Sequence, residues 1–557
     1  MDPALRSVTL LRSQGPAMAL LAVVLAPLLA VAVLAGQSLG DPAAWAALWR
    51  APQTPSALAL TLWTGLASTA LAWWISAWLL AQAFVRQGLL HMTRALPAML
   101  ATPHAALAIG LVFLVAPSGW LLRAVSPWLT GFEFPPPWPT TQDPWGLGLI
   151  VALVLKEVPF LLWTAASQLQ REDVRRRWLA EHSLAQTLGY GPSRAWWRVV
   201  WPQLAPRLWW PLMAVLAYGL TVVDMAMVIG PASPPTLAVL AWQWLQDADL
   251  AVNAQGAAAG GLLALLVLVG GLGWWGLSRL GLRLPDGRRG SLPCTSNGPS
   301  GSRPGTPWAW RALVLTYAAI LLALAVGSVA GVWPFPRLLP EAWTLQAWRS
   351  VWASAGTVTD TLLLAATSSL LSLLWCVAWL ELAPRHWDNT LRPLLYLPLV
   401  LPGVLWVVGL YGLVLRLHWE GQWTGLLLAH TTLVLPYVLL ALSPAYLGFD
   451  PRYRGLAASL GHGRWHFLWR VKWPLLRRAL AASAAVGFAV SVAQYLPTLY
   501  VGAGRWNTVT TEAVTLAAGA QRSLTGAYAW LQFVLPVLGF ALAAWVGRPR
   551  RFTVSHP

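Results

Sequence analysis

Charge, lysine and cysteine are all scarce in this sequence. Only 10% of the 557 residues are charged, whereas a soluble protein carries about a quarter. The two lysines, Lys156 and Lys472, do not lie between a glycine and a serine or threonine, which excludes a Walker A phosphate loop. The two cysteines, Cys294 and Cys376, are too few and too far apart for a disulfide framework or a structural zinc site. The composition therefore argues against a soluble domain and against ATP hydrolysis by this chain itself.

Apolar residues are abundant instead, at 57% of the chain. Twelve segments approach the ~20 mostly apolar residues that a membrane-spanning helix needs. They lie at residues 17–36, 57–83, 95–117, 146–168, 207–229, 256–277, 310–332, 357–381, 394–416, 424–447, 479–500 and 527–547. The first is interpreted as an uncleaved helix rather than a signal peptide, because the second half has a matching helix. The sequence predicts an all-α polytopic membrane protein with about twelve transmembrane helices.

The distribution of basic residues predicts how the chain lies in the membrane. The net charge of +18 comes from residues in the short loops between the apolar segments. With a cytoplasmic N-terminus, 29 of the 37 Lys and Arg residues fall in cytoplasmic regions and seven in outer loops. Cytoplasmic loops of membrane proteins carry such an excess, so both termini are predicted to be cytoplasmic. This pattern favours the lipid bilayer, and not a nucleic acid, as the surroundings of the basic residues.

Prolines interrupt the third and fourth apolar segments of each half at matching places. They are Pro97, Pro103 and Pro159 in the first half and Pro398, Pro402 and Pro436 in the second. Because proline breaks the hydrogen-bond ladder of a helix, a bend or hinge is predicted at each. Packing kinks explain any single one of them, whereas the match between the halves favours a role in gating.

The most informative stretch occurs twice. Residues 184–204 read LAQTLGYGPSRAWWRVVWPQL, and residues 456–476 read LAASLGHGRWHFLWRVKWPLL, with eleven of the 21 positions identical. Matches of Leu and Ala carry little weight in an apolar chain, but a shared G-x-G and a shared W-R-V-x-W-P do. The chain is therefore predicted to be a parallel repeat of two six-helix halves, residues 1–279 and 310–557, joined by a flexible cytoplasmic linker at 280–309.

Both copies of this stretch lie in strongly basic cytoplasmic loops, residues 171–206 and 448–478. The pattern predicts a helix that ends at a glycine turn, then a short helix capped by Ser193. An amphipathic segment resting on anionic lipid explains the Arg and Trp residues. Docking of a cytosolic partner also explains why both halves keep the same turn. The candidate docking residues are Ala185, Gly189, Gly191 and Arg198, with Ala457, Gly461, Gly463 and Arg470 in the second half.

This repeated loop resembles the EAA loop of ABC importer permeases. That loop reads E-A-A-x-x-x-G, followed by a spacer and an apolar stretch with proline. Its second alanine and its glycine have counterparts at Ala185, Gly189, Ala457 and Gly461. Ser183 and Gly455 stand where the family has glutamate, and Glu181 is the nearby acid in the first half.

The resemblance covers nearly the whole chain, and the two fused halves look like the iron(III)- and thiamine-type permeases of that family. It implies a bacterial inner-membrane permease subunit that moves a small solute and is not an enzyme. Two copies of a cytosolic ATPase would bind ATP and dock on the two loops, so the permease itself needs no cofactor. A periplasmic solute-binding protein would deliver the cargo. The resemblance leaves iron(III), thiamine or another small solute open.

Few polar residues lie inside the predicted helices. Asp224 in the fifth helix and Gln494, at the place taken to correspond in the eleventh, are candidates for the translocation pathway. Lys156 and Glu157 are adjacent in the fourth helix and point in different directions, so each is expected to find a partner on another helix. A pairing of Lys156 with Asp224 would cancel the preference of Asp224 for a cationic cargo. We find no residue pattern that indicates a catalytic or metal site.

Two other classes of protein compete with this interpretation. A secondary transporter also has twelve helices and a central linker, but its basic signatures lie in loops 2–3 and 8–9. In this chain, those loops hold two basic residues each, whereas loops 4–5 and 10–11 hold seven each. A membrane-embedded enzyme would need acidic or histidine residues gathered at an interface, and the sequence shows none.

Overall fold

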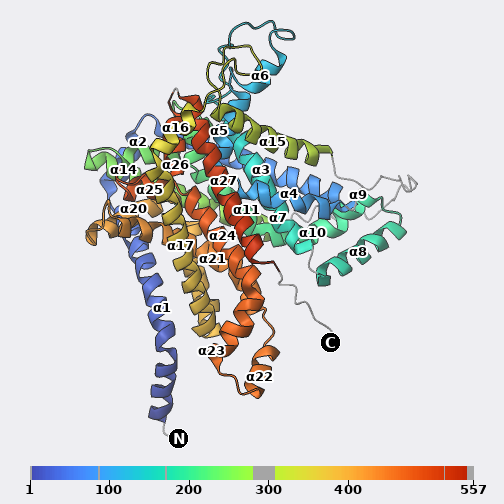
Figure 1. The fold of residues 1–557 in the computed structure, drawn as a ribbon, viewed down its shortest axis with the longest axis vertical. Helices are drawn as coiled ribbons and strands as arrows, with labels where there is room; N and C mark the ends of the chain where they lie inside the picture. Colours follow the sequence, from blue (N-terminus) through green and yellow to red (C-terminus); the bar gives the residue numbers. More distant parts are fainter. Residues whose placement is uncertain (1–2, 86–87, 170–171, 280–307, 520, 549–557) are drawn as a thin grey trace. The chain divides into compact units, whose positions relative to one another are not determined.

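The computed structural model describes residues 3–85, 88–169, 172–279, 308–519 and 521–548 (Figure 1). Residues 280–307, which make up nearly all of the predicted linker and include Cys294, lie outside the described part. The described residues form helices and connecting segments, and their only β-type pairing is an isolated bridge between Ala330 and Trp343. The predicted all-α fold is confirmed.

Ten helical spans in the described part are long and apolar enough to cross a membrane, and a bent helix pair raises the number to eleven. The spans lie in α1 (Pro3–Ser38), α3 (Thr54–Val85), α5 with α6 (His104–Val115 and Trp120–Val125), α7 (Leu147–Leu169), α14 (Leu250–Arg279), α15 (Trp308–Ser328), α17 (Ala355–Leu382), α21 (Trp423–Leu447), α24 (Trp473–Ala493) with the short helices before it, and α27 (Arg522–Val546). Shorter helices join them: α2 (Pro42–Arg50), α4 (Leu89–Ala101), α8 (Glu172–Thr187), α13 (Leu237–Leu245), α16 (Gln346–Ala353), α22 (Arg452–Ser459) and α26 (Val509–Ala517).

Two of the twelve predicted crossings, the fifth and the ninth, are missing from the ten spans because their helices are broken. The third is also broken, but it still contains the span His104–Val125. The third segment is broken between α4 and α5 at Thr102 and Pro103. The ninth consists of α18 (Arg385–Leu395), α19 (Leu397–Val400) and α20 (Gly403–Arg416), with a bend of 100° before α20. Proline explains both of these breaks, because it lacks the N–H that would continue the ladder.

The predicted fifth crossing is also divided, although no proline lies at its break. It forms α11 (Trp209–Thr221) and α12 (Asp224–Ile229), separated by Val222 and Val223. The eleventh segment is divided in the same way, into α24 and α25 (Leu496–Val501), at Gln494 and Tyr495. The backbone is extended at both Val222 and Gln494.

The described helices form two compact units, each of which takes its first helix from the other half of the sequence. The first-half unit contains residues 41–348 and 516–530, and therefore includes α15. The second-half unit contains residues 1–40, 349–515 and 531–557, and therefore includes α1. The boundaries of the sequence repeat, 1–279 and 310–557, stay a prediction. The two units are defined by which helices pack together, whereas the repeat is defined by which sequences are alike.

Two equivalent glycines allow these first helices to pack closely. A Cβ atom on Gly409 of α20 would overlap the carbonyl oxygen of Val31 in α1. A Cβ atom on Gly110 of α5 would lie 2.6 Å from a side-chain carbon of Ile320 in α15. Such contacts are too short for any residue with a side chain. A glycine at equivalent positions thus allows α1 to pack closely within the second-half unit and α15 to pack closely within the first-half unit.

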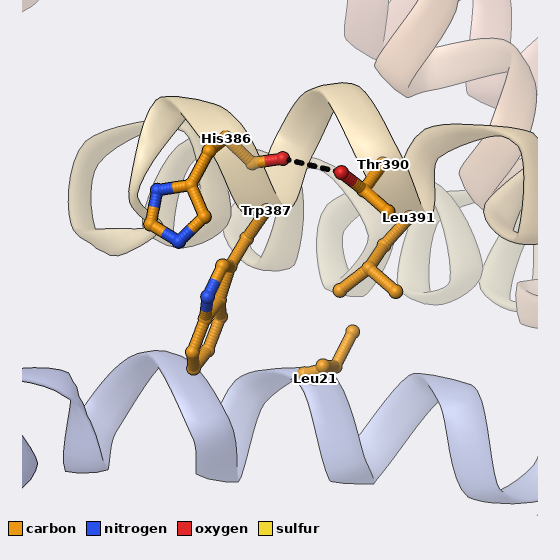
Figure 2. A pocket seen from close by; sticks show the side chains of 5 residues that line it. All are labelled: Leu21, His386, Trp387, Thr390 and Leu391. Carbon is orange, nitrogen blue, oxygen red and sulfur yellow. Dashed lines mark hydrogen bonds between the residues drawn. The ribbon is translucent and has the colours of Figure 1, made fainter.

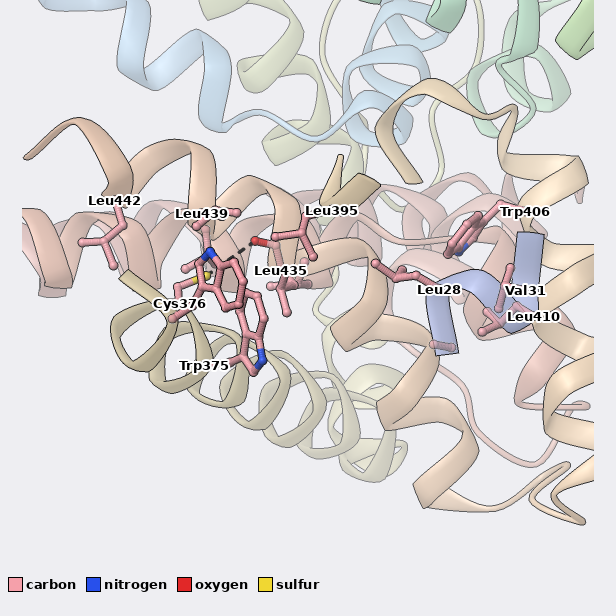
Figure 3. Packing of buried hydrophobic residues seen from close by; sticks show 14 of the residues in the cluster. Leu28, Val31, Trp375, Cys376, Leu395, Trp406, Leu410, Leu435, Leu439 and Leu442 are labelled. Carbon is pink, nitrogen blue, oxygen red and sulfur yellow. Dashed lines mark hydrogen bonds between the residues drawn. The ribbon is translucent and has the colours of Figure 1, made fainter. Parts of the chain in front are cut away.

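The core of the second-half unit shows how tightly α1 is held (Figure 3). Leu28 and Val31 of α1 are buried with Trp406 and Leu410 of α20. The indole N–H of Trp375 in α17 also donates to the carbonyl oxygen of Leu20, at 2.8 Å. Helix α1 is therefore an integral part of this unit rather than a peripheral anchor.

A matching hydrogen bond fixes how the two halves correspond. Thr61 Oγ1 in α3 accepts from the backbone N–H of Leu237 at 2.8 Å, and Thr361 Oγ1 in α17 accepts from Val509 at 2.9 Å. Leu237 and Val509 begin α13 and α26. Helix α3 therefore corresponds to α17, and α13 corresponds to α26.

An open pocket of about 280 Å³ lies between α1 and α18 in the second-half unit (Figure 2). Its lining consists of Leu21, His386, Trp387, Thr390 and Leu391. The Thr390 hydroxyl donates to the carbonyl oxygen of His386 at 2.9 Å, so this polar group already has a partner. The pocket is mostly apolar and offers little that would bind a charged cargo.

Candidate functional site

The first glycine turn, residues 184–204, begins where α8 ends. The backbone N–H of Tyr190 donates to the carbonyl oxygen of Ala185 at 3.1 Å, and that of Gly189 donates to Gln186 at 3.0 Å. Gly189 has a φ of +89°. These two bonds around a left-handed residue form a Schellman motif, which satisfies the last carbonyls of a helix. The predicted helix stop at Gly189 is therefore present.

The second glycine turn, residues 456–476, has the same backbone. The N–H of His462 donates to the carbonyl oxygen of Ala457 at 3.0 Å, and that of Gly461 donates to Ala458 at 3.0 Å. Gly461 has a φ of +78°. Ala185 and Ala457 occupy the same place in the two motifs, and both of their side chains are buried. The repeat in sequence is thus a repeat in structure.

The two glycines of each G-x-G have different backbone requirements. Gly191 has φ and ψ of −63° and 154°, and Gly463 has −71° and 169°, so any residue can adopt these conformations. Gly191 is the N-cap of α9 (Pro192–Ala195), and Gly463 is the N-cap of α23 (Arg464–Phe467). The prediction that Ser193 caps the short helix is wrong, because Pro192 takes the first helical position and Ser193 lies inside the helix.

A wide π-helical turn follows the short helix in both copies. It covers η1 (Trp196–Val200) in the first and η3 (Leu468–Lys472) in the second, and each is followed by a Trp-Pro pair. The proline ring would clash with the carbonyl group four residues earlier in an α-helix, and the wider turn relieves this clash. The shared W-P therefore has a backbone explanation. Arg198 and Arg470 lie in these turns and are exposed.

Exposed leucines at equivalent positions were missed by the sequence analysis as candidate contacts. Leu184 and Leu188 are 61% and 63% exposed in the first turn, and Leu456 and Leu460 are 60% and 66% exposed in the second. Both pairs are identities of the repeat, but a leucine in an apolar sequence gives no sign of being exposed. Exposed apolar side chains at the same places on two turns are typical of surfaces that contact a partner or lipid.

The first glycine turn is anchored to its unit mainly by aromatic rings. Trp196 is fully buried, with its ring centroid 4.8 Å from that of Phe84 in α3. Phe84 also packs against the ring of His182 in α8, at 5.1 Å. The first turn is therefore held against the end of α3 by packed rings, tilted between Phe84 and Trp196 and edge-on between Phe84 and His182.

Glu181 adds a polar contact within the same turn. Its carboxylate accepts from Arg177 Nε at 2.7 Å and from Gln203 Nε2 at 2.7 Å. These hydrogen bonds, that from Arg177 first, hold the pKa of the Glu181 carboxyl below its usual range. Ser183 and Gly455, which stand where the family has glutamate, are both exposed. Glu181 thus links α8 to the segment after the π turn, α10 (Trp201–Leu204).

Lys156 lies at the break between α4 and α5 in the first-half unit. Its side chain is buried and donates to the carbonyl oxygens of Leu100 and Thr102. These carbonyls lack helical partners because the chain continues with Pro103, and a cation is favoured at such a helix C-terminus. In the described part of the chain, neither Glu157 nor Asp224 forms an ion pair with Lys156. Glu157 is buried beside it in α7.

Asp224 begins α12, directly after the break in the fifth segment. The Tyr218 hydroxyl donates to Asp224 Oδ1 at 3.3 Å, and the Tyr218 ring lies 4.4 Å from that of His104. His104 begins α5, after the other break. The structure thus gathers polar groups at both breaks of this unit, and their role in translocation stays a prediction.

The second-half unit places a network of polar side chains without an acidic residue at its corresponding break. His430 Nδ1 lies 2.8 Å from Ser491 Oγ, and its Nε2 lies 2.9 Å from Thr498 Oγ1. Gln494 Nε2 donates to the carbonyl oxygen of His430 at 3.4 Å. The matching breaks align Gln494 with Val222, and Asp224 with Leu496. The predicted equivalence of Asp224 and Gln494 is therefore wrong by two residues.

Within the described residues, no group of three or more His, Cys, Asp or Glu side chains is arranged to hold a metal ion.

Comparison with known proteins gives the family. No protein-family model matches the chain. The chain is 34% identical over 543 residues to the inner membrane ABC transporter permease protein YnjC of Escherichia coli (strain K12), covering 96% of this chain and 97% of that protein. It is 33% identical over 121 residues to the thiamine transport system permease protein ThiP of the same organism, covering 19% and 23%. It is 31% identical over 129 residues to the molybdenum transport system permease protein ModB of Mycobacterium bovis, covering 21% and 49%. The chain therefore belongs to the family of ABC transporter permeases of the inner membrane.

Proposed function

We propose that this chain is the membrane subunit of an ATP-driven importer and that the two glycine turns are the docking sites of two separate cytosolic ATPase subunits. ATP binding would draw the two ATPase subunits together and move both turns. The helix bundle would then alternate between outward-facing and inward-facing states. The residues of this chain would hold the ATPase subunits in place and transmit their movement to the helix bundle. The hydrolysis of ATP would take place in the ATPase subunits.

One observation supports this proposal more strongly than any other. Two stretches far apart in the sequence share a Schellman turn, a π turn and a pair of leucines that are about equally exposed. A segment resting on lipid would need apolar residues and arginines but no particular backbone. Two identical backbones with the same exposed side chains suit a partner that presents two equivalent surfaces.

The cargo is proposed to be a small solute delivered by a periplasmic binding protein. Partial relatives are named for thiamine and molybdenum transport, which makes these the first solutes to test, together with iron(III). A secondary transporter is the second candidate, but no observation on the turns favours it. The relative that matches 96% of the chain is named as an ABC transporter permease.

Co-purification with the ATPase tests this proposal. The variants Leu188→Glu and Leu460→Glu place a charge on the proposed contact surface without changing the turn backbone. We expect each to reduce recovery of the ATPase about tenfold, because desolvating a charge at an apolar contact costs more than the ~1.4 kcal/mol that equals a factor of ten.

Leu345→Glu is the matched control, because Leu345 is also 60% exposed but lies outside both turns. It should leave recovery of the ATPase unchanged. Failure of the unaltered protein to bring down any ATPase would contradict the proposal, and so would full recovery with both Leu188→Glu and Leu460→Glu.

A further inference from the structure

An ionic cluster joins the second glycine turn to two long helices of its own unit. Glu381, near the end of α17, accepts from Lys472 Nζ at 2.6 Å and lies 3.4 Å from Arg464 Nη2. Arg464 begins α23, and Lys472 ends the π turn η3. The side chains of Glu381 and Lys472 are only 15% and 13% exposed. Glu381 therefore holds both ends of the segment between the glycine turn and α24.

Tyr446 extends the cluster to α21. Its hydroxyl donates to Glu381 Oε2 at 3.1 Å, and Lys472 Nζ lies 3.9 Å from the centroid of its ring. The indole N–H of Trp473, the first residue of α24, donates to the same hydroxyl at 3.3 Å. Figure 1 shows α22 and α23 projecting from the ends of α21 and α24. The cluster thus lies where the turn joins the bundle.

The first half has apolar residues at the corresponding places. Thr61 and Thr361 set the register of α3 against α17, which pairs Ala81 with Glu381. The sequence repeat pairs Val200 with Lys472. Ala81 and Val200 are 4% and 0% exposed. The first turn is held instead by the rings of Phe84 and Trp196, and the second half has Pro384 and Leu468 at those places.

The physical properties of the two anchors differ. Packed aromatic rings tolerate more than one mutual arrangement, tilted and edge-on in the first anchor, whereas a charge-assisted hydrogen bond is short and directional. A largely buried ion pair adds little net stability, because desolvating the charges offsets their attraction. Stability alone therefore gives no reason for Glu381 and Lys472 at a place where the first half uses alanine and valine.

We propose that Glu381 is a positioning residue that passes movement of the second glycine turn to α17 and α21 through Lys472, Arg464 and Tyr446. The first turn passes its movement through aromatic packing. This inference rests on the proposed function, since it assigns a transmitting role within the same coupling. In the second half, the transmission of movement from the glycine turn to the helices therefore depends on charged side chains.

Hydrolysis of Mg-ATP by the complete transporter in proteoliposomes tests the proposal. The central variant is Glu381→Ala with Lys472→Val, which installs the pair found in the first half. It removes both charges together, so no buried charge is left alone, and it leaves the leucines of the turn in place. We expect unchanged thermal unfolding, unchanged recovery of the ATPase and about tenfold slower hydrolysis, a factor that corresponds to ~1.4 kcal/mol.

The charge-conserving Glu381→Asp with Lys472→Arg is the rescue variant, because it keeps a carboxylate between two cations, and it should retain more than half of the rate that the Ala/Val variant loses. Glu341→Gln is the control, because its exposed ion pair with Arg337 touches neither turn, and its rate should equal that of the unaltered protein. Full hydrolysis in the Ala/Val variant would overturn the inference, since the ion pair would then be merely structural. Absence of the ATPase from the unaltered complex would instead overturn the proposed function, so the two failures are distinguishable.

Discussion

The two glycine turns have the same backbone but different surroundings. Each has a left-handed glycine, a short helix and a π turn in the same order. The first is anchored by the rings of Phe84 and Trp196, and the second by the carboxylate of Glu381. The surface that would meet a partner has thus stayed alike in the two halves, whereas the groups that fix each turn to its own helices have diverged.

The helix breaks of the two units repeat this contrast. Both units divide a helix at equivalent residues, but the first-half unit places Lys156 and Asp224 near its breaks, and the second-half unit places His430 and Gln494 there. Backbone geometry is therefore shared, whereas the polar groups beside it are particular to each half.

The largest expected effect concerns the shared turns. Gly189→Val and Gly461→Val place a β-branched residue at a positive φ, which costs roughly 1–2 kcal/mol and opens the turn. We expect each variant to lower hydrolysis of Mg-ATP by the transporter about tenfold, and equally in the two halves, because this energy cost corresponds to about that factor.

The second glycine of each motif provides the control for this prediction. Gly191→Ala and Gly463→Ala keep an ordinary φ, and a Cβ atom at either position meets nothing within 4 Å. Both variants should retain full hydrolysis. Damage equal to that of the valine variants would show that side-chain contacts, and not the left-handed backbone, matter at these turns.

A second effect, on stability rather than on hydrolysis, should separate the two halves. Lys156→Met leaves the carbonyls of Leu100 and Thr102 without a donor, which should cost about 1–3 kcal/mol. Thermal unfolding of the purified protein in detergent measures this loss. Leu433→Met is the matched control, because Leu433 precedes Pro436 as Lys156 precedes Pro159, and it should unfold nearly as the unaltered protein does. Equal losses in both variants would mean that the Lys156 contacts contribute nothing.

The smallest effect should be the same in both halves. Thr61→Val and Thr361→Val each remove the acceptor for one backbone N–H, that of Leu237 or Val509, and each should cost about 1 kcal/mol. Thermal unfolding again provides the measurement. A loss in one half alone would contradict the structural correspondence of α3 with α17.

The helices were predictable because a bilayer demands long apolar segments, and these stand out in the sequence. The breaks at Thr102 and Leu401 could be anticipated from the prolines that follow them. The break at Val222 could not, because nothing in a run of apolar residues marks where a helix stops. The predicted equivalence of Asp224 with Gln494 was wrong because it rested on both residues being polar. The constant spacing between the two copies of the repeat pairs Asp224 with Leu496 instead.

The site was predictable where backbone geometry restricts the residue type. Gly189 and Gly461 could be found because a left-handed helix end requires glycine. The anchors could not be found, since Glu381 and Lys472 lie 91 residues apart and no sequence signal relates them. The exposure of Leu184 and Leu456 also depends on tertiary structure, which a local pattern does not contain.

The exchange of first helices has a consequence for how the chain matures. Helix α1 is synthesised well before the second half, yet its packing partners Trp406 and Leu410 lie in α20. The whole first half, the linker and the second half as far as α20 must therefore leave the ribosome before α1 can bury its inner face. Until then, Gly409 offers no surface for Val31, and α1 must be accommodated by lipid or by the insertion machinery. A truncated first half would carry an unpartnered α1 and lack α15, so each half completes its fold only when the other has been made.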